Sequence, residues 1–156
     1  MYTIFDIAFW FRKKKRNDMT QKKIQKLCYY AQAWSMALYN KPLIDCKFEA
    51  WAHGPVCREL WEQLKVHTYY NVPIEPLRKL KTTPIRKEED KSFLERVWST
   101  YGKFDGYQLE ILTHKEQPWI KARGNTPEMQ RCTNVISNED MRDYYITLYA
   151  GDGVSE

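Results

Sequence analysis

Glycine is scarce in this chain of 156 residues, and its six glycines do not form a phosphate-binding loop. Such a loop needs closely spaced glycines, because the backbone must approach the phosphate oxygens directly. The GxSxG sequence that carries the nucleophile of many hydrolases is also missing. The sequence therefore predicts no cofactor and no catalytic site of these kinds.

Cysteine and histidine are few and widely separated. The cysteines form no CxxC pair, and no two histidines stand close enough in sequence to suggest shared ligation of a metal ion. This spacing argues against a zinc site and a disulfide framework, so we predict no metal and reduced thiols. Cys28 falls on an apolar helical face and is expected to be a small buried hydrophobe. The residues concerned are Cys28, Cys46, Cys57, Cys132, His53, His67 and His114.

Long apolar runs are missing as well. No stretch approaches the ~18 residues that a membrane span requires. The apolar segment from Ile4 to Phe11 precedes the basic run, which is the reverse of the order in a signal peptide. We therefore expect a cytoplasmic protein without a membrane partner.

Positive charge is concentrated at one end of the chain. The formal net charge is +5, whereas residues 1–30 hold eight Lys and Arg against two Asp, which leaves the rest slightly acidic. A basic corner can steer an acidic partner or a nucleic acid, although a charge run is also typical of a solvated helix end. No helix-turn-helix pattern accompanies the basic run, which argues against nucleic acid as a partner.

Aromatic residues are abundant, at 15% of the chain. Consecutive tyrosines on a helix point about 100° apart. One of Tyr29 and Tyr30 is therefore expected to be only half buried and available as an interface anchor. The alternative is a thick core that also takes in Trp34, Trp51 and Trp61, with the tyrosine hydroxyls hydrogen-bonded inside it. The sequence does not separate these two interpretations.

The hydrophobic periodicity predicts a mainly α-helical fold, a single compact domain of about six to eight helices over residues 1–150. Helices are expected from residue 2 or 3 to Lys15 and, after an N-cap at Thr20, to about Tyr39. Others are expected over about 56–64, 88–101 and 106–113, and from about 118. A last helix, capped by Ser137 with Asp140 three residues later, should run to about Tyr149, where Gly151 ends it, and leave a frayed tail, 151–156.

Two segments are expected to be extended. Residues 43–52 alternate imperfectly between apolar and polar, which predicts a short extended or β segment. In residues 70–86, Pro73, Pro76 and Pro84 argue against a continuous helix and favour an extended loop. Between these segments, His53-Gly54-Pro55 is interpreted as a turn that opens a helix, with Pro55 at the first helical position.

The segment around His114 admits two interpretations. His114 with Glu116 nearby could serve as an acid–base pair. No nucleophile or cofactor cradle accompanies the pair, however. The interpretation that we favour is that Thr113 or His114 makes buried hydrogen bonds that hold the helix junction at Pro118-Trp119.

Three segments resemble the SocA-like antitoxins that carry the Panacea domain, a family that includes the phage-associated GepA proteins. They are Lys26-Leu27-Cys28-Tyr29-Tyr30-Ala31-Gln32-Ala33-Trp34, Glu49-Ala50-Trp51-Ala52-His53-Gly54-Pro55-Val56 and Thr113-His114-Lys115-Glu116-Gln117-Pro118-Trp119 with Ala122-Arg123. The resemblance runs in order from about Ile4 to Arg123, and Cys28 stands where a second Leu is commoner. The residues that it implies as the shared scaffold are Lys26, Leu27, Tyr29, Tyr30, Trp34, Trp51, His53, Gly54, Pro55, Thr113, His114, Glu116, Pro118, Trp119 and Arg123.

The resemblance implies a non-enzymatic antitoxin of a type II toxin–antitoxin system, which neutralises a cognate toxin encoded beside it by direct protein contact. Members also include a proteolytic adaptor that delivers its toxin to a ClpXP-type protease, which is the alternative function. Because the pattern begins almost at Met1, we expect no separate DNA-binding segment. Toxin specificity is expected on the Pro-rich stretch from His67 to Arg86 or on the C-terminal helix. The sequence leaves toxin-binding residues and homo-oligomerisation open.

Overall fold

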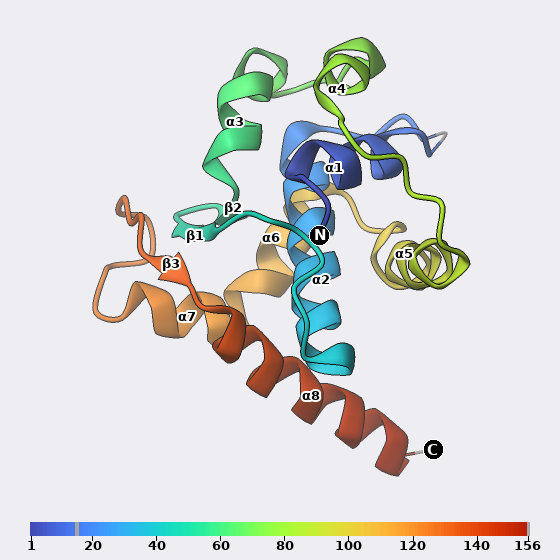
Figure 1. Ribbon diagram of the computed structural model, residues 1–156. Coiled ribbons are helices and arrows are strands. Elements are labelled where there is room, and N and C mark those ends of the chain that lie inside the picture. Colours follow the sequence, from blue (N-terminus) through green and yellow to red (C-terminus); the bar gives the residue numbers. More distant parts are fainter. Residues whose placement is uncertain (15, 156) are drawn as a thin grey trace.

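The computed structural model describes residues 1–14 and 16–155, without the side chains of residues 152–155. Within this part the chain forms eight α-helices, one short 3₁₀ helix and a small sheet, which confirms the mainly α-helical prediction (Figure 1). The elements are α1 Ile4–Arg12, α2 Gln21–Tyr39, β1 Phe48–Trp51, β2 Gly54–Val56, α3 Arg58–Leu64, η1 Lys65–His67, α4 Ile74–Leu80, α5 Glu88–Tyr101, α6 Gly106–His114, α7 Gln117–Arg123, β3 Val135–Ile136 and α8 Asn138–Ser155.

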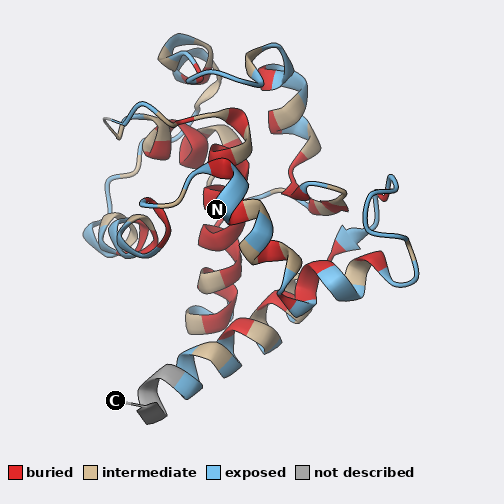
Figure 2. Ribbon diagram, turned by 180° about the vertical axis from the view of Figure 1, so that it is seen from behind, coloured by how far each residue is buried: buried red, intermediate tan, exposed pale blue. Residues whose placement is uncertain are grey.

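Helix α2 is the centre of the molecule. It begins after Thr20, whose side chain accepts a hydrogen bond from the Lys23 amide, and ends at Asn40, which adopts the left-handed conformation with φ 50°. Both ends agree with the prediction. Helices α1, α5, α6 and α8 pack around it, so that the helix is buried along nearly its whole length (Figure 2).

Because α2 is enclosed, its polar side chains bond to other parts of the chain. Gln21 donates to the Leu64 carbonyl, and Gln25 exchanges hydrogen bonds with the backbone of Cys57. Gln32 accepts from the amides of residues 43 and 44 and donates to the carbonyl of residue 44. The side-chain amide of each glutamine thus fixes one segment at a helix end or in a loop. Without it, the backbone polar groups of that segment would be buried and unsatisfied.

The prediction that one of Tyr29 and Tyr30 is half exposed was wrong. Both side chains are completely buried. Their rings meet edge to face with centroids 5.4 Å apart, and both lie near the Tyr145 ring of α8, which helps to cover them from solvent. The thick-core alternative is correct for the two tyrosines, whose hydroxyls are hydrogen-bonded inside the protein, whereas Trp34, Trp51 and Trp61 are only partly buried. Cys28 is buried, as predicted.

The first helix is shorter than expected. α1 is capped by Thr3 and Asp6, which form a reciprocal capping box, and it ends at Arg12. The predicted end at Lys15 falls on a residue outside the described part.

The sheet has the strand order β2-β1-β3, with both pairs antiparallel. β1 lies inside the segment predicted to be extended. The prediction that Pro55 begins a helix was wrong, since Pro55 is the middle residue of β2 and pairs with Ala50. Gly54 has φ +104°, a conformation that favours glycine and that turns the chain back against β1 instead of into a helix.

The Pro-rich stretch contains a helix that the sequence interpretation missed. α4 occupies Ile74–Leu80, and no strand is described between 70 and 86. Pro76 is tolerated because it falls in the first turn, where the backbone N–H groups have no partner within the helix.

The C-terminal helix begins as predicted, with the Ser137 hydroxyl accepting from the Asp140 amide at 3.0 Å. α8 crosses α2 and passes residue 151 to Ser155 (Figure 1). The predicted fraying of residues 151–156 falls mostly on side chains outside the described part and stays a prediction, as does the domain boundary at 150. Among the described residues, no helix is long and apolar enough to cross a membrane.

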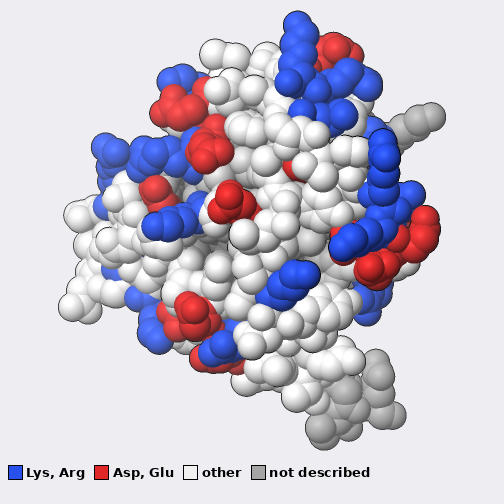
Figure 3. Space-filling model, in the orientation of Figure 1, with Lys and Arg blue, Asp and Glu red and all other residues white. Residues whose placement is uncertain are grey.

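The predicted basic corner is only partly a surface. Lys23 and Lys26 are buried, and Lys22 forms an ion pair with Glu110. Lys23 donates to the Gly102 carbonyl at 2.6 Å and pairs with Asp18 at 3.0 Å. One group of exposed positive charges lies over α4 and along the neighbouring edge toward α5, in the upper right of Figure 3.

The cap of α2 gives a stability prediction. Thr20→Ala removes the hydroxyl that accepts from the Lys23 amide and should lower the free energy of unfolding by about 1 kcal/mol. Urea denaturation measures the change. The matched control is Thr100→Ala on exposed α5, which should leave stability unchanged or raise it by up to about 0.5 kcal/mol. Equal effects of the two substitutions would contradict the role of the cap.

Candidate functional site

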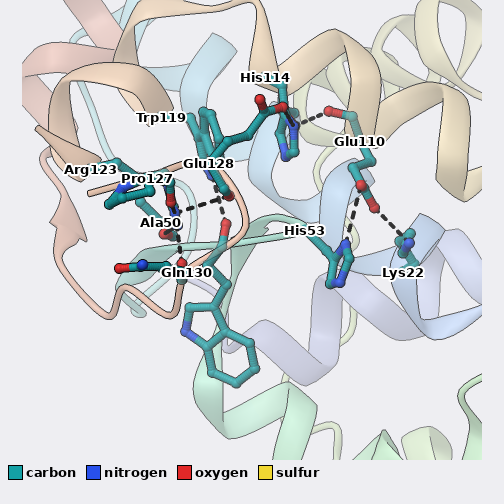
Figure 4. A network of polar contacts seen from close by, with 12 residues as sticks. Lys22, Ala50, His53, Glu110, His114, Trp119, Arg123, Pro127, Glu128 and Gln130 are labelled. Atoms are coloured by element: carbon teal, nitrogen blue, oxygen red, sulfur yellow. Dashed lines mark hydrogen bonds and ion pairs between the residues drawn. The ribbon is translucent and has the colours of Figure 1, made fainter. Parts of the chain in front are cut away.

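The three segments that resemble the family meet at one place. α2 supplies Lys26 and Tyr30, the β1–β2 turn supplies His53, and the α6–α7 junction supplies His114 and Glu116. Contacts of α2 with β2 and α6, and of α7 with β1, bring these segments together. Figure 4 shows part of the resulting polar network.

Glu116 is the most deeply buried carboxylate of this site. Its Oε1 accepts hydrogen bonds from the Tyr30 hydroxyl at 2.6 Å and from the Tyr145 hydroxyl at 2.8 Å. The hydroxyls of Tyr29 and Tyr145 lie 3.2 Å apart. One carboxyl thus links α2, α8 and the start of α7. Burial raises the pKa of Glu116 to about 7, against the opposing effect of the two hydroxyl donors.

Stacked aromatic rings extend this cluster. Tyr30 stacks on Tyr101 with 3.9 Å between ring centroids, and the Trp34 indole donates to the Tyr101 hydroxyl at 2.7 Å. These contacts tie α5 to α2. Leu27 lies in the adjoining core.

Arg123 holds the connection that follows α7. Its guanidinium donates to the Ala50 carbonyl at 2.9 Å and to the carbonyls of Pro127, Glu128 and Gln130 at 2.6, 3.1 and 2.7 Å (Figure 4). Four backbone oxygens therefore converge on one buried cation. Arginine suits this role because its donors point in several fixed directions.

Trp119 and His114 form the outer wall. The Trp119 indole donates to the Trp51 carbonyl at 2.8 Å, and the His114 ring stacks on Trp119 with centroids 4.0 Å apart. His114 Nδ1 lies 3.7 Å from Glu128, whereas His114 Nε2 is buried and has no hydrogen-bond partner among the described residues. Burial lowers the pKa of His114.

Lys26 is the buried cation of the site. The residue is 1% exposed. A Cβ at Gly54 would lie 2.6 Å from Lys26 Cε and 3.0 Å from Thr113 Oγ1, so the absence of a side chain at Gly54 provides the space for the lysine. Burial lowers the pKa of Lys26 to about 7.

Glu110 connects the site to solvent. It pairs with Lys22 at 2.6 Å and with His53 Nδ1 at 3.2 Å (Figure 4). Burial opposes ionisation of Glu110, but the Lys22 and His53 contacts outweigh it and lower its pKa. The sequence interpretation missed Glu110 and Lys22. The signal was their spacing, because Glu110 precedes His114 by four residues and Lys22 precedes Lys26 by four, which places each pair on one helix face.

The geometry does not assemble the acid–base pair considered from the sequence. His114 faces Trp119 and Glu128, whereas Glu116 bonds to buried tyrosines on the inner side of the junction. The favoured interpretation also needs correction in detail. Thr113 bonds to the Glu110 carbonyl of its own helix, and the junction is held by Glu116, Trp119 and Arg123.

The other residues predicted as the scaffold are buried or packed against neighbouring side chains. Pro55 is buried in β2, and Pro118 is buried in the first turn of α7. Trp51 makes an edge contact with Trp61, with centroids 5.3 Å apart. Searched over the described residues, the chain holds no group of three His, Cys, Asp or Glu side chains placed to bind a metal ion.

Glu116 should give stability a specific pH dependence. The pKa of Glu116 is about 7 in the folded protein and 4.5 for an ordinary glutamate, so between these values the folded state binds more protons than the unfolded state. The contribution of Glu116 to the free energy of unfolding should therefore fall as pH rises through this window, by up to about 3 kcal/mol. Glu116→Gln keeps an acceptor oxygen and should remove this fall. The measurement is urea denaturation across the window, and Gln117→Ala, an exposed neutral neighbour, should retain the wild-type slope.

Lys26 should act in the opposite direction at higher pH. Its pKa of about 7, against 10.5 for an ordinary lysine, means that the unfolded state binds more protons between these values. Wild-type stability should therefore rise with pH in this window. Lys26→Met should be more stable than wild type by on the order of 3 kcal/mol below pH 7, with the difference shrinking as pH rises. A difference that is constant with pH would contradict a buried, titrating Lys26.

Comparison with known proteins agrees with this arrangement. The family model of the SocA-like antitoxins, Panacea domain, matches residues 24–120, which include all three motif segments up to Ile120. No curated protein and no solved structure gave a match. Since the match covers more than half of the chain, the protein belongs to the SocA-like antitoxin family with the Panacea domain.

Proposed function

We propose that this chain is the antitoxin of a type II toxin–antitoxin system and that it neutralises a protein toxin in the cytoplasm by direct binding. Family membership supports an antitoxin role with a protein partner. The proposal adds the mechanism, in which the chain covers its partner and performs no chemistry.

The observation that carries the proposal is the division between an inward-facing motif cluster and an outward-facing aromatic segment. Tyr30, Glu116, Trp119 and Arg123 are buried and bonded within the body. They hold the fold and present little surface to a partner.

The segment after α3 has the opposite character. Val66, Tyr69 and Tyr70 are 79%, 84% and 79% exposed. Large apolar and aromatic side chains grouped on a surface are typical of protein interfaces. We name residues 65–70 the aromatic segment.

The aromatic segment is anchored at its C-terminal end. Met19 donates to the Asn71 side chain at 2.7 Å, and the Val72 amide donates to the Met19 carbonyl at 2.9 Å. Arg12 also bonds to the Val72 carbonyl. A loop that is already fixed loses less conformational entropy on binding, which favours affinity. Tyr69 and Tyr70 lie within the stretch His67 to Arg86, where toxin specificity was expected, and Val66 lies just before it.

The proposal is tested by co-expression with the product of the adjacent gene. Wild type should yield a stoichiometric complex by mass measurement and relieve growth inhibition. Tyr69→Ser with Tyr70→Ser should weaken the complex by ~10-fold or more, because exposed tyrosines are frequent binding hot spots. The control is Tyr107→Ser, on α6, which removes a tyrosine that is 64% exposed and should leave affinity unchanged.

Two other outcomes have definite meanings. A wild-type chain that forms no complex and gives no rescue would refute the antitoxin proposal, and mass measurement would then report whether it is a monomer or a homo-oligomer. A proteolytic adaptor predicts instead that the half-life of the toxin falls when this chain and a ClpXP-type protease are both present. An unchanged half-life with growth rescue would exclude the adaptor.

A further inference from the structure

A cleft with a basic rim lies between α1 and the connection from α4 to α5. Its volume is about 320 Å³, and its lining includes Phe9, Trp10, Lys13, Lys81 and Lys91. We name it the basic cleft. It is distinct from the motif cluster, because none of the family-motif residues lines it.

Cations converge on the aromatic side of this cleft. The ammonium groups of Lys13 and Lys81 lie 4.9 and 5.4 Å from the centroid of the Phe9 ring, and the Arg78 guanidinium lies 5.3 Å from it. Contact with an aromatic face is favourable for each cation, but the cations repel one another. Grouping them around one ring therefore favours an anionic partner.

These cations are not neutralised within the molecule. Among the described residues, Lys13 and Lys81 have no carboxylate within ion-pair distance, whereas Arg78 pairs with Glu75 at 3.1 Å and Lys91 with Glu88 at 3.4 Å. Both of these pairs lie on the surface and are weak.

One acidic residue lines the cleft, and its carboxylate is already engaged. Asp6 accepts hydrogen bonds from the amides of Thr3, Thr82 and Thr83 at 2.9, 2.7 and 2.9 Å, and it is 2% exposed. Burial opposes its ionisation, but these backbone donors lower its pKa. Asp6 thus fixes the α4–α5 connection against α1 and preforms the cleft. Its charge offsets part of the lysine charge.

We propose that the basic cleft binds an acidic segment of the partner protein, with a carboxylate side chain placed between Lys13 and Lys81. This inference rests on the proposed function, since the partner is the toxin that the chain neutralises. Charge complementarity at such a site mostly sets the association rate and the choice of partner.

The size and surroundings of the cleft favour a protein segment over a nucleic acid. About 320 Å³ accommodates a few side chains over an aromatic floor. A nucleic acid would contact a longer positive stripe, because its phosphates are regularly spaced along the strand. Figure 3 instead shows carboxylates at both ends of the basic edge, over α4 and near α5.

The test is charge reversal at the rim. Lys13→Glu with Lys81→Glu should weaken binding of the co-expressed adjacent-gene product by ~10-fold or more at low salt, chiefly through a slower association rate. Wild-type affinity should fall with added salt, and the variant should show a smaller fall. Lys103→Glu with Lys115→Glu, at the two ends of α6, makes the same change of charge at exposed positions and should leave affinity unchanged. Lys13→Gln with Lys81→Gln provides a milder pair if the reversal impairs folding.

The outcomes separate this inference from the proposed function. A wild-type complex that the cleft variants leave unaltered at every salt concentration would overturn the cleft and leave the antitoxin proposal standing. Absence of a wild-type complex would overturn both. Poly-glutamate and a short DNA duplex serve as direct probes. Binding of the duplex that is lost in the cleft variants, without any binding of poly-glutamate, would overturn the inference in favour of a nucleic-acid site.

Discussion

Helix α2 is buried along most of its length, so each polar side chain on its buried faces must find a partner inside the molecule or destabilise the fold. Gln21, Gln25 and Gln32 meet this requirement by bonding to irregular backbone, and Tyr30 meets it by donating to Glu116. The interactions that satisfy the helix therefore also fix the connections around it. Loss of one partner would leave a buried polar group without compensation, which is the expensive case. This constraint explains why polar residues define the centre of a small helical protein.

Lys26 of α2 and His114 of α6 are buried titratable groups in the same cluster. His114 Nε2 has no hydrogen-bond partner among the described residues, and burial lowers the pKa of both side chains. Perturbed titratable groups often mark functional sites, but structural networks perturb them as well. Here Gly54 leaves room for the lysine, Trp119 supports the histidine, and the acid–base pair does not form. We therefore interpret the cluster around Lys26 and His114 as a structural junction of the three motif segments. Burying these two groups there lowers the stability of the fold.

The features suited to a partner lie elsewhere on the body. The aromatic segment 65–70 and the basic cleft both belong to the region where α1 meets the chain between α3 and α5. One offers exposed apolar area, and the other offers cations that lack internal partners. The two are complementary in kind, because apolar contacts supply most of the affinity and charges supply rate and selectivity.

The sequence predicted structural features correctly where the interactions that determine them involve residues a few positions apart. The Thr20 cap, the end of α2 near Tyr39 and the helical pattern of α5 all follow from residues a few positions apart, and the three motifs identified the family. Tertiary structure decided the rest. Tyr29 and Tyr30 are both buried because distant helices enclose α2, Pro55 lies in a strand because β1 is available to pair with it, and Glu110 joins Lys22 because α6 packs on α2. Burial, strand pairing and ion pairing between distant segments depend on which surfaces meet, and a single sequence does not encode that in its local pattern.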